Sequence, residues 1–366
     1  MTVLLFFLIL SLLVFVHESG HFFAARKAGV GVEEFGFGFP PRLASFRRHG
    51  TVWSLNLIPF GGFVRLKGER AGEIQELNSF AAAGVGKKMV IIAAGVFMNY
   101  CLAWVIFTSV FIHGLRADQT QVPNDPWQAW NNVATEAIVA SGSPAAKAGL
   151  LERDQVLSIN GQPLQSTDQV IALAQSNKYP VLSIVIEHLG RQRTIQVTPT
   201  SESGPTPHYG FGLARVGTLS YPWYVAPWYG ATTTVSLSWQ TVKGLASIAG
   251  QLVSHGRVSS DVTGPVGIAV LTGQVRQLGL TTLAQFVAVL SLSLAVVNFL
   301  PIPALDGGRA AFILVEHFRG KQINPKIENA IHSIGFYILI SFVLLISVRD
   351  VQRFGIVHRL ATWFHF

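Results

Sequence analysis

The sequence predicts an α-helical polytopic membrane protein with four transmembrane helices, a membrane-associated β-hairpin and one extracytoplasmic α+β domain. Three observations predict this fold class. Half of the 366 residues are apolar and 13% are charged, about half the charged share of a soluble domain. The mean hydropathy is +0.42. Long apolar runs flank a more polar middle segment. With Cys101 as its single cysteine, the chain is neither a disulfide-rich module nor, at this hydropathy, a disordered chain or a coiled coil.

The first predicted span covers residues 3–25, which are apolar apart from a few positions around residues 17–21. As a helix it would be about 34 Å long, enough to cross a hydrocarbon core of about 30 Å. A cleaved signal peptide is the alternative. It is disfavoured because the segment lacks a basic start and a small-residue cleavage site.

Three further apolar runs predict the remaining spans, at residues 89–114, 283–300 and 334–348. Residues 225–253 are different, because their apolar side chains alternate with Thr, Ser, Gln and Lys. We interpret this segment as an amphipathic helix that lies on the membrane surface.

Basic residues set the expected orientation. Residues 24–88 contain ten Lys and Arg against five acids, whereas residues 118–224 contain six basic and eight acidic residues, a net charge of −2. By the positive-inside rule, the first and third loops face the cytoplasm, and the middle domain and both termini lie outside. Because topology accounts for the net charge of +8, we predict a lipid bilayer and no nucleic acid as partner.

These features divide the chain into four regions. The expected regions are residues 1–117 with the first two transmembrane helices and the hairpin, residues 118–204 with the outer domain, residues 205–281 with a linker and the amphipathic membrane-surface helix, and residues 282–366 with the last two transmembrane helices.

Within the outer domain, alternating apolar residues predict short strands, and the polar stretch at residues 201–207 is typical of a linker. The expected elements are strands at 136–140 and 156–160, a helix at 168–175, and a hairpin formed by 181–187 and 193–197.

Residues 17–21 read His-Glu-Ser-Gly-His, the H-E-x-x-H pattern. On a helix, His17 and His21 share a face, so both imidazoles can reach one metal ion, and the Glu18 carboxylate beside them can take a proton from water. A carboxylate inside a span is rare without a partner or a function. We interpret the pattern as a zinc site with Glu18 as general base. The alternative is a polar cluster that caps the helix end among the lipid headgroups.

A catalytic zinc takes three protein ligands, so a third is expected from another span. Asp306 follows the third span and is the only acid between Asp261 and Glu316. Prolines break the helix before it, and two glycines after it allow close backbone approach. We predict Asp306 as the third zinc ligand, with a turn residue as the alternative. Asn298 is expected to donate a hydrogen bond to a developing oxyanion. The alternative is a hydrogen bond between two helices.

Residues 51–67 carry a hairpin signal, because apolar residues lie on both sides of a Pro-Phe-Gly-Gly sequence at 59–62. A hairpin beside the zinc offers a strand edge where an unwound substrate segment can be held extended by β-addition. Unwinding is required because a helical peptide bond is shielded by its own hydrogen bonds. The alternative is a hairpin that merely plugs the site. The predicted substrate-binding residues are Leu57, Phe60, Gly61, Gly62 and Phe63.

HESGH at residues 17–21 and NFLPIPALDGG at 298–308 together resemble the zinc motifs of the site-2 protease family of intramembrane zinc metalloproteases. FGFGF at 35–39 and PFGGFV at 59–64 resemble its re-entrant β element, and GPVGIA at 264–269 resembles its segment ahead of the third span. The resemblance covers most of the chain. It implies Zn²⁺ as cofactor, transmembrane proteins as substrates, and an active site toward the cytoplasmic side.

SGSPAAKAGL at residues 141–150, Asp154 and VLSING at 156–161 resemble a PDZ domain, although Arg153 stands where many relatives have Gly. Such domains capture peptides or chain ends by strand addition, so a peptide ligand is expected, with a spacer as the alternative. The group with a PDZ domain between the second and third spans includes the bacterial regulator-of-sigma-factor proteases. This implies the cytoplasmic (inner) membrane, with anti-sigma factors and signal-peptide remnants as substrates.

Two other function classes are alternatives to an intramembrane zinc endopeptidase. A non-catalytic membrane scaffold could recruit partners through the PDZ domain, but it needs no general base such as Glu18. A metal-ion transporter would carry polar ligands on several spans, and only two spans supply them here. The sequence therefore favours the endopeptidase.

Overall fold

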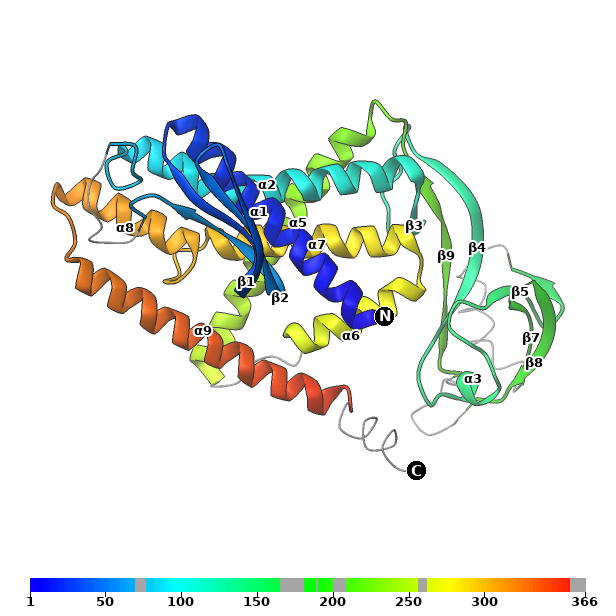
Figure 1. Ribbon diagram of the computed structural model, residues 1–366. Helices are drawn as coiled ribbons and strands as arrows, with labels where there is room; N and C mark the ends of the chain where they lie inside the picture. The colour runs from blue at the N-terminus through cyan, green and yellow to red at the C-terminus, as the bar shows by residue number, and fades with distance from the viewer. Residues whose placement is uncertain (70–76, 165–180, 189, 200–208, 256–261, 356–366) are drawn as a thin grey trace. The chain divides into compact units, whose positions relative to one another are not determined.

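The computed structural model describes residues 1–69, 77–164, 181–188, 190–199, 209–255 and 262–355, except for the side chains of Phe60, Leu252, Val253 and His255. The chain forms two compact units (Figure 1). The helical unit comprises Met1–Val110 and Pro227–Phe366, and the sheet unit comprises Phe111–Ala226.

The elements follow one another in the order α1 (Thr2–Ala28), β1 (Val32–Arg48), β2 (Thr51–Leu66), α2 (Val85–His113), β3 (Leu115–Asp118), β4 (Ala129–Val139), α3 (Pro144–Lys147), β5 (Gln155–Ile159), β6 (Gln162–Pro163), β7 (Leu182–His188), β8 (Arg191–Val197), β9 (Phe211–Ser220), α5 (Ala226–His255), α6 (Pro265–Gln277), α7 (Leu280–Phe299), α8 (Asp306–Arg319) and α9 (Pro325–Arg353).

Four of the described helices are long and apolar enough to cross a membrane, namely α1, α2, α7 and α9. Each contains most or all of one predicted span, so the prediction of a four-span polytopic membrane protein is confirmed. Helix α9 is much longer than the predicted 334–348, because it begins at a good helix start. Pro325 occupies its first turn, and the Asn324 side chain caps it by accepting a hydrogen bond from Lys326 N.

Helix α1 ends where the sequence changes from apolar to basic. Gly29 adopts a left-handed conformation with φ of 80°, and its N–H bonds the carbonyls of Ala25 and Arg26. Arg26 and Lys27 in the last turn complement the negative end of the helix dipole. The chain therefore turns sharply into β1, and both β1 and β2 pack against α1 (Figure 1).

Strands β1 and β2 form an antiparallel pair whose turn lies at His49 and Gly50. Both residues have positive φ, 50° and 81°, as a two-residue hairpin turn requires. The predicted turn at Pro59–Gly62 was wrong, because these residues lie inside β2. They bend that strand along α1, where Ser11 Oγ donates a hydrogen bond of 2.7 Å to the Pro59 carbonyl.

The bends let β1 and β2 pair in three places. Residues 32–37 pair with 62–66, residues 34–37 pair with 52–55, and residues 42–48 pair with 51–56. Phe35 is in register with both Val64 and Trp53, so it has strand neighbours on both sides. Within the described part of the chain, residues 62–66 have a strand on one side alone and therefore form an edge of the sheet.

The sheet unit contains a seven-stranded sheet with the order β3-β9-β4-β5-β7-β8, and β6 pairs with β5. The predicted strands at 136–140 and 156–160 correspond to β4 and β5, and the predicted hairpin to β7 and β8. Strand β9 lies in the segment expected as a linker, and the unit is wider than the expected 118–204. The helix expected at 168–175 and the linker at 201–207 lie outside the described residues.

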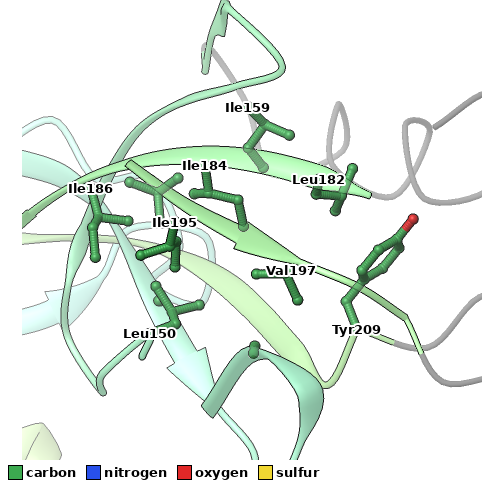
Figure 2. Close-up of a cluster of buried hydrophobic side chains, with 11 residues drawn as sticks. Leu150, Ile159, Leu182, Ile184, Ile186, Ile195, Val197 and Tyr209 are labelled. Atoms are coloured by element: carbon green, nitrogen blue, oxygen red, sulfur yellow. The ribbon is translucent and has the colours of Figure 1, made fainter. Parts of the chain in front are cut away.

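A hydrophobic core holds the sheet unit together (Figure 2). Along β7, Leu182, Ile184 and Ile186 are each fully buried and alternate with partly exposed residues, as expected for a strand with one face in the core. Short helix α3 caps this core through the predicted SPAAKAGL segment. The Ser143 hydroxyl accepts a hydrogen bond from Ala146 N, and Pro144 occupies the first helical turn.

In the helical unit, α6 is attached to α9 through one buried carboxylate. Asp350 on α9 is 1% exposed and its Oδ2 accepts hydrogen bonds from Gly264 N at 2.9 Å and Gly267 N at 2.8 Å. These amides belong to the free N-terminus of α6, where a negative charge is favourable. The GPVGIA segment thus gains a cap from a helix more than eighty residues away.

Candidate active site

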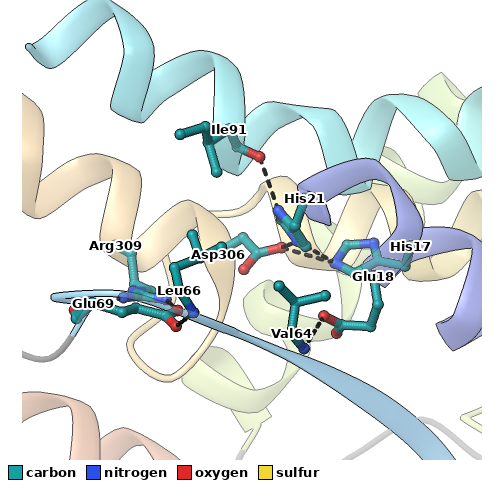
Figure 3. Close-up of polar contacts among 9 residues, drawn as sticks. All are labelled: His17, Glu18, His21, Val64, Leu66, Glu69, Ile91, Asp306 and Arg309. Carbon is teal, nitrogen blue, oxygen red and sulfur yellow. Dashed lines mark hydrogen bonds and ion pairs between the residues drawn. The ribbon is translucent and has the colours of Figure 1, made fainter. Parts of the chain in front are cut away.

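Helices α1 and α8 bring three metal-binding side chains together (Figure 3). His17 Nε2 lies 2.9 Å and His21 Nε2 lies 3.2 Å from Asp306 Oδ2, and the two Nε2 atoms are 3.2 Å apart. His17 is 6% exposed, and all three ligand atoms lie within 4.8 Å of one another. The predicted meeting of two distant stretches of chain therefore occurs in the structure.

The hydrogen bonds behind the imidazoles orient them toward this point. His21 Nδ1 lies 2.8 Å from the Ile91 carbonyl, which can only accept, so Nδ1 carries a proton and Nε2 is the nitrogen left to bind a metal. His17 Nδ1 lies 3.5 Å from the side-chain amide of Asn99, which is fully buried. Lone pairs that converge with a carboxylate repel one another unless a cation lies between them. Two imidazole nitrogens and one carboxylate oxygen form a donor set that fits zinc.

Small residues allow α1 and α2 to approach closely around the imidazoles. A Cβ atom added at Gly20 would lie 2.3 Å from the Ala94 carbonyl oxygen. A Cβ atom added at Gly95 would lie 2.3 Å from His21 Nε2 and 2.9 Å from His17 Cε1. These contacts are shorter than any normal packing distance, so both positions require glycine.

A tight turn after α7 positions Asp306. The chain leaves α7 at Phe299, and Ala304 adopts a left-handed φ of 77° before α8 begins at Asp306. A Cβ atom at Gly307 would lie 2.2 Å from the Leu300 carbonyl oxygen, and one at Gly308 would lie 2.3 Å from that of Ile302. The two glycines therefore let the first turn of α8 fold directly onto the preceding loop.

Helix α9 supports this turn from the other side. His332 Nδ1 accepts a hydrogen bond of 3.0 Å from the backbone N–H of Ala304, the residue with the left-handed conformation. A Cβ atom at Gly335 would lie 2.5 Å from Pro303 Cβ, so α9 also contacts the loop closely. The position of Asp306 thus depends on a span that supplies no ligand.

Glu18 lies beside the group and faces the edge of the sheet. Its Oε2 accepts a hydrogen bond of 2.9 Å from Val64 N on β2. Glu18, His21 and Asp306 together line a cavity of about 160 Å³, which is large enough for several water molecules. The carboxylate is therefore next to both a possible metal position and a space for water.

A second charged pair lies next to this cavity. The Arg309 guanidinium on α8 forms an ion pair with the Glu69 carboxylate and donates a hydrogen bond of 3.1 Å to the Glu69 carbonyl. Burial opposes the charge of Arg309, but the attraction of Glu69 and other carboxylates raises the pKa of Arg309 above its usual value. Arg309 lies three residues after Asp306, so both project from one side of α8.

The predicted substrate-binding residues lie at different distances from Glu18 and its cavity. Gly62 and Phe63 lie near Glu18, since a Cβ atom at Gly62 would be 4.0 Å from Glu18 Cγ and Phe63 lines the same cavity. Gly61, with φ of 111°, packs against Val14 of α1. Leu57 is 55% exposed and does not line the cavity, and the Phe60 side chain lies outside the described residues.

Asn298 is half-buried in the last turn of α7, eight residues before Asp306. It does not line the 160 Å³ cavity, and none of the hydrogen bonds recorded among the described residues joins it to the two histidines. Its predicted role as an oxyanion donor stays a prediction.

Sequence reasoning missed several neighbours of the site. Gly95 lies four residues before Asn99 on α2, a spacing that places small and polar residues on one helix face and could have drawn attention to Gly95. Asn99 itself, which interrupts the second predicted span, is expected from the sequence to hydrogen-bond near the site or to pack between helices, and its side-chain amide lies 3.5 Å from His17 Nδ1. Glu69 and Arg309 carry no such signal, because 240 residues separate them.

The chain is similar to known peptidases over most of its length. The sequence model of peptidase family M50 matches residues 5–342. The regulator of sigma-W protease RasP of Bacillus subtilis is 29% identical over 96% of this chain and 98% of that protein. Proteins named as zinc metalloproteases are 33% identical in Clostridium perfringens, over 93% of this chain and 96% of theirs, and 31% identical in Rhizobium meliloti, over 96% of each.

Proposed function

Since this chain belongs to peptidase family M50 and is a membrane zinc metalloprotease, we propose that it is an intramembrane endopeptidase that cleaves transmembrane helices of single-pass membrane proteins. His17, His21 and Asp306 hold the zinc ion, and Glu18 is the general base. The observation that carries the proposal is the convergence of the three ligand atoms within 4.8 Å of one another, next to Glu18.

The residues around the metal position divide the chemistry between them. When bound, zinc polarises the scissile carbonyl and acidifies water. Glu18 takes a proton from the attacking water as the carbon–oxygen bond forms, and then gives it to the leaving amine as the carbon–nitrogen bond breaks. Asn298, at the end of α7, is proposed to donate an amide hydrogen bond to the developing oxyanion.

The sheet edge supplies the second part of the proposal. A transmembrane substrate must unwind before its peptide bond is accessible, and the edge at residues 62–66 can hold the unwound segment by strand addition. Gly62 and Phe63 support this role because Gly62 lies near Glu18 and Phe63 lines the cavity. Gly61 precedes them and packs against Val14 of α1. Leu57 and Phe60, which come earlier in β2, remain predicted contacts of the substrate.

The name of one relative supports a substrate class. The name of RasP ties that protein to sigma-W, which supports anti-sigma factors as substrates of this chain and signal-peptide remnants as a second class. In this proposal the chain lies in a bacterial inner membrane with both termini outside. The sheet unit is an extracytoplasmic PDZ domain, expected over residues 118–204, that binds a peptide end or excludes bulky substrates. Membership of family M50 disfavours the alternative of a non-catalytic scaffold.

The test compares Glu18→Gln with the wild type in detergent, using a tagged transmembrane peptide as substrate. Removing the general base is expected to lower cleavage by about 100-fold or more while the zinc content stays at one ion per chain. His17→Ala is expected to lose both zinc and cleavage. Glu316→Gln, a change at a carboxylate on α8 that does not line the cavity at Glu18, is the matched control. Undiminished cleavage in Glu18→Gln would contradict the assignment.

A further inference from the structure

The edge of β2 at the active site is already occupied by side chains of the protein itself. Val64 N donates a hydrogen bond to Glu18 Oε2, and Leu66 N donates one to Glu69 Oε2, each at 2.9 Å. In a strand, the N–H groups of residues i and i+2 point to the same edge. The other edge of this segment is paired with β1. Two carboxylates therefore occupy the outward N–H groups of the segment at residues 62–66.

A carboxylate oxygen that accepts a hydrogen bond from a strand N–H occupies the position that the carbonyl oxygen of a neighbouring strand would otherwise take. A peptide added to this edge would offer carbonyls at every second residue, which matches the spacing of Val64 and Leu66. It must first displace the carboxylate at Leu66. We propose that the Leu66 N–H is a substrate-binding donor and that Glu69 occupies it until a substrate strand takes its place, an inference that rests on the proposed function.

Arg309 holds Glu69 in this position. It contacts both the carboxylate and the backbone carbonyl of Glu69, and its guanidinium carbon lies 5.8 Å from the centre of the Phe80 ring. Because Arg309 is on the first turns of α8 with Asp306, the pair links the metal position to the end of β2 (Figure 3). Charge-assisted hydrogen bonds are stronger than neutral ones, so a substrate carbonyl competes against a strong resident ligand.

The cavities around the pair support this role. Glu69 and Arg309 line the 160 Å³ cavity at Glu18 and also a larger cavity of about 720 Å³, whose lining includes Glu328 and His332 of α9. Residues 63, 64 and 66 of β2 line both cavities. The pair therefore lies where an extended segment in the larger space would reach the strand edge that leads to Glu18.

The first experiment measures steady-state cleavage of the transmembrane peptide by Glu69→Ala. Because the resident competitor is gone, KM is expected to fall by about 3- to 10-fold with little change in kcat. Glu316→Ala is the matched control and keeps the wild-type KM, because the Glu316 carboxylate on α8 also accepts a backbone hydrogen bond, from Ile323 N at 2.8 Å, but lines neither cavity. If Glu69→Ala does not fold, Glu69→Gln gives a smaller decrease in the same direction. An unchanged or higher KM in a folded, zinc-loaded variant overturns the inference.

The second experiment does not require cleavage. Hydrogen exchange of the Leu66 amide is measured in the Glu18→Gln background, with and without saturating transmembrane peptide. In Glu69→Ala the free protein is expected to exchange this amide at least about tenfold faster, and the peptide is expected to restore protection. An amide that stays unprotected at saturation overturns the inference. A wild-type protein that binds peptide at this edge but never cleaves it contradicts the proposed function instead.

Discussion

At the scale of single residues, the spacing of the two imidazoles depends on Gly95, which contributes no chemistry. We predict that Gly95→Ala lowers zinc affinity by about tenfold or more, because its Cβ atom would lie 2.3 Å from His21 Nε2 and must displace the ring. Zinc retained after dialysis against a chelator is the measurement. Gly86→Ala is the control, since Gly86 lies on the same helix with no atom within 4 Å of the added carbon. Equal zinc retention in both variants contradicts the prediction.

At the scale of elements, apolar length made the four spans predictable, because a run of about twenty apolar residues has few alternatives to a membrane-spanning helix. The meeting of Asp306 with His17 and His21 was also predictable, since zinc chemistry demands a third ligand and the prolines and glycines of the third span mark where backbone can bend. The β1–β2 turn was not, because His49 carries no turn signal as strong as the Pro-Phe-Gly-Gly sequence that in fact bends β2.

The contacts between distant residues could not be predicted from the sequence, for a different reason. The Glu69–Arg309 and Asp350–α6 contacts join residues far apart in the chain, and no local pattern marks their partners. Taken alone, each of these residues is an ordinary charged residue near the end of a helix or strand. Burial selects the partner. A buried charge without a compensating group costs folding free energy, so each charge lies next to a group that pairs with it.

The Asp350 contact gives a prediction about how elements are joined. Asp350→Ala leaves two buried N–H groups at the start of α6 without their acceptor, so we expect a loss of about 2–4 kcal/mol in the free energy of unfolding. Thermal unfolding of the detergent-solubilised protein measures it. Ser347→Ala is the matched control on α9, because the Ser347 hydroxyl bonds only the Val343 carbonyl one turn earlier among the recorded contacts of the described residues. A melting temperature equal to that of the control contradicts the prediction.

At the scale of the whole molecule, the candidate metal site and the core of the sheet unit are built from separate parts of the chain. All three proposed zinc ligands, Glu18, and the loops and glycines that position them lie in the helical unit. The sheet unit has its own core of buried residues on β5, β7 and β8. Because neither the metal position nor its supports draw on that core, zinc uptake is expected to survive loss of the sheet unit's packing.

Ile184→Asp tests this separation. Ile184 is fully buried on β7, and an unpaired carboxylate there is expected to unfold the sheet unit, at a cost of about 4 kcal/mol or more. Zinc content is expected to stay at one ion per chain, while proteases cut the sheet unit readily. Val185→Asp is the matched control, because Val185 is the next residue on β7 and points to the less buried face. If Ile184→Asp loses its zinc while remaining in the membrane fraction, the metal position depends on the sheet unit, and the independence argued from the ligand positions is wrong.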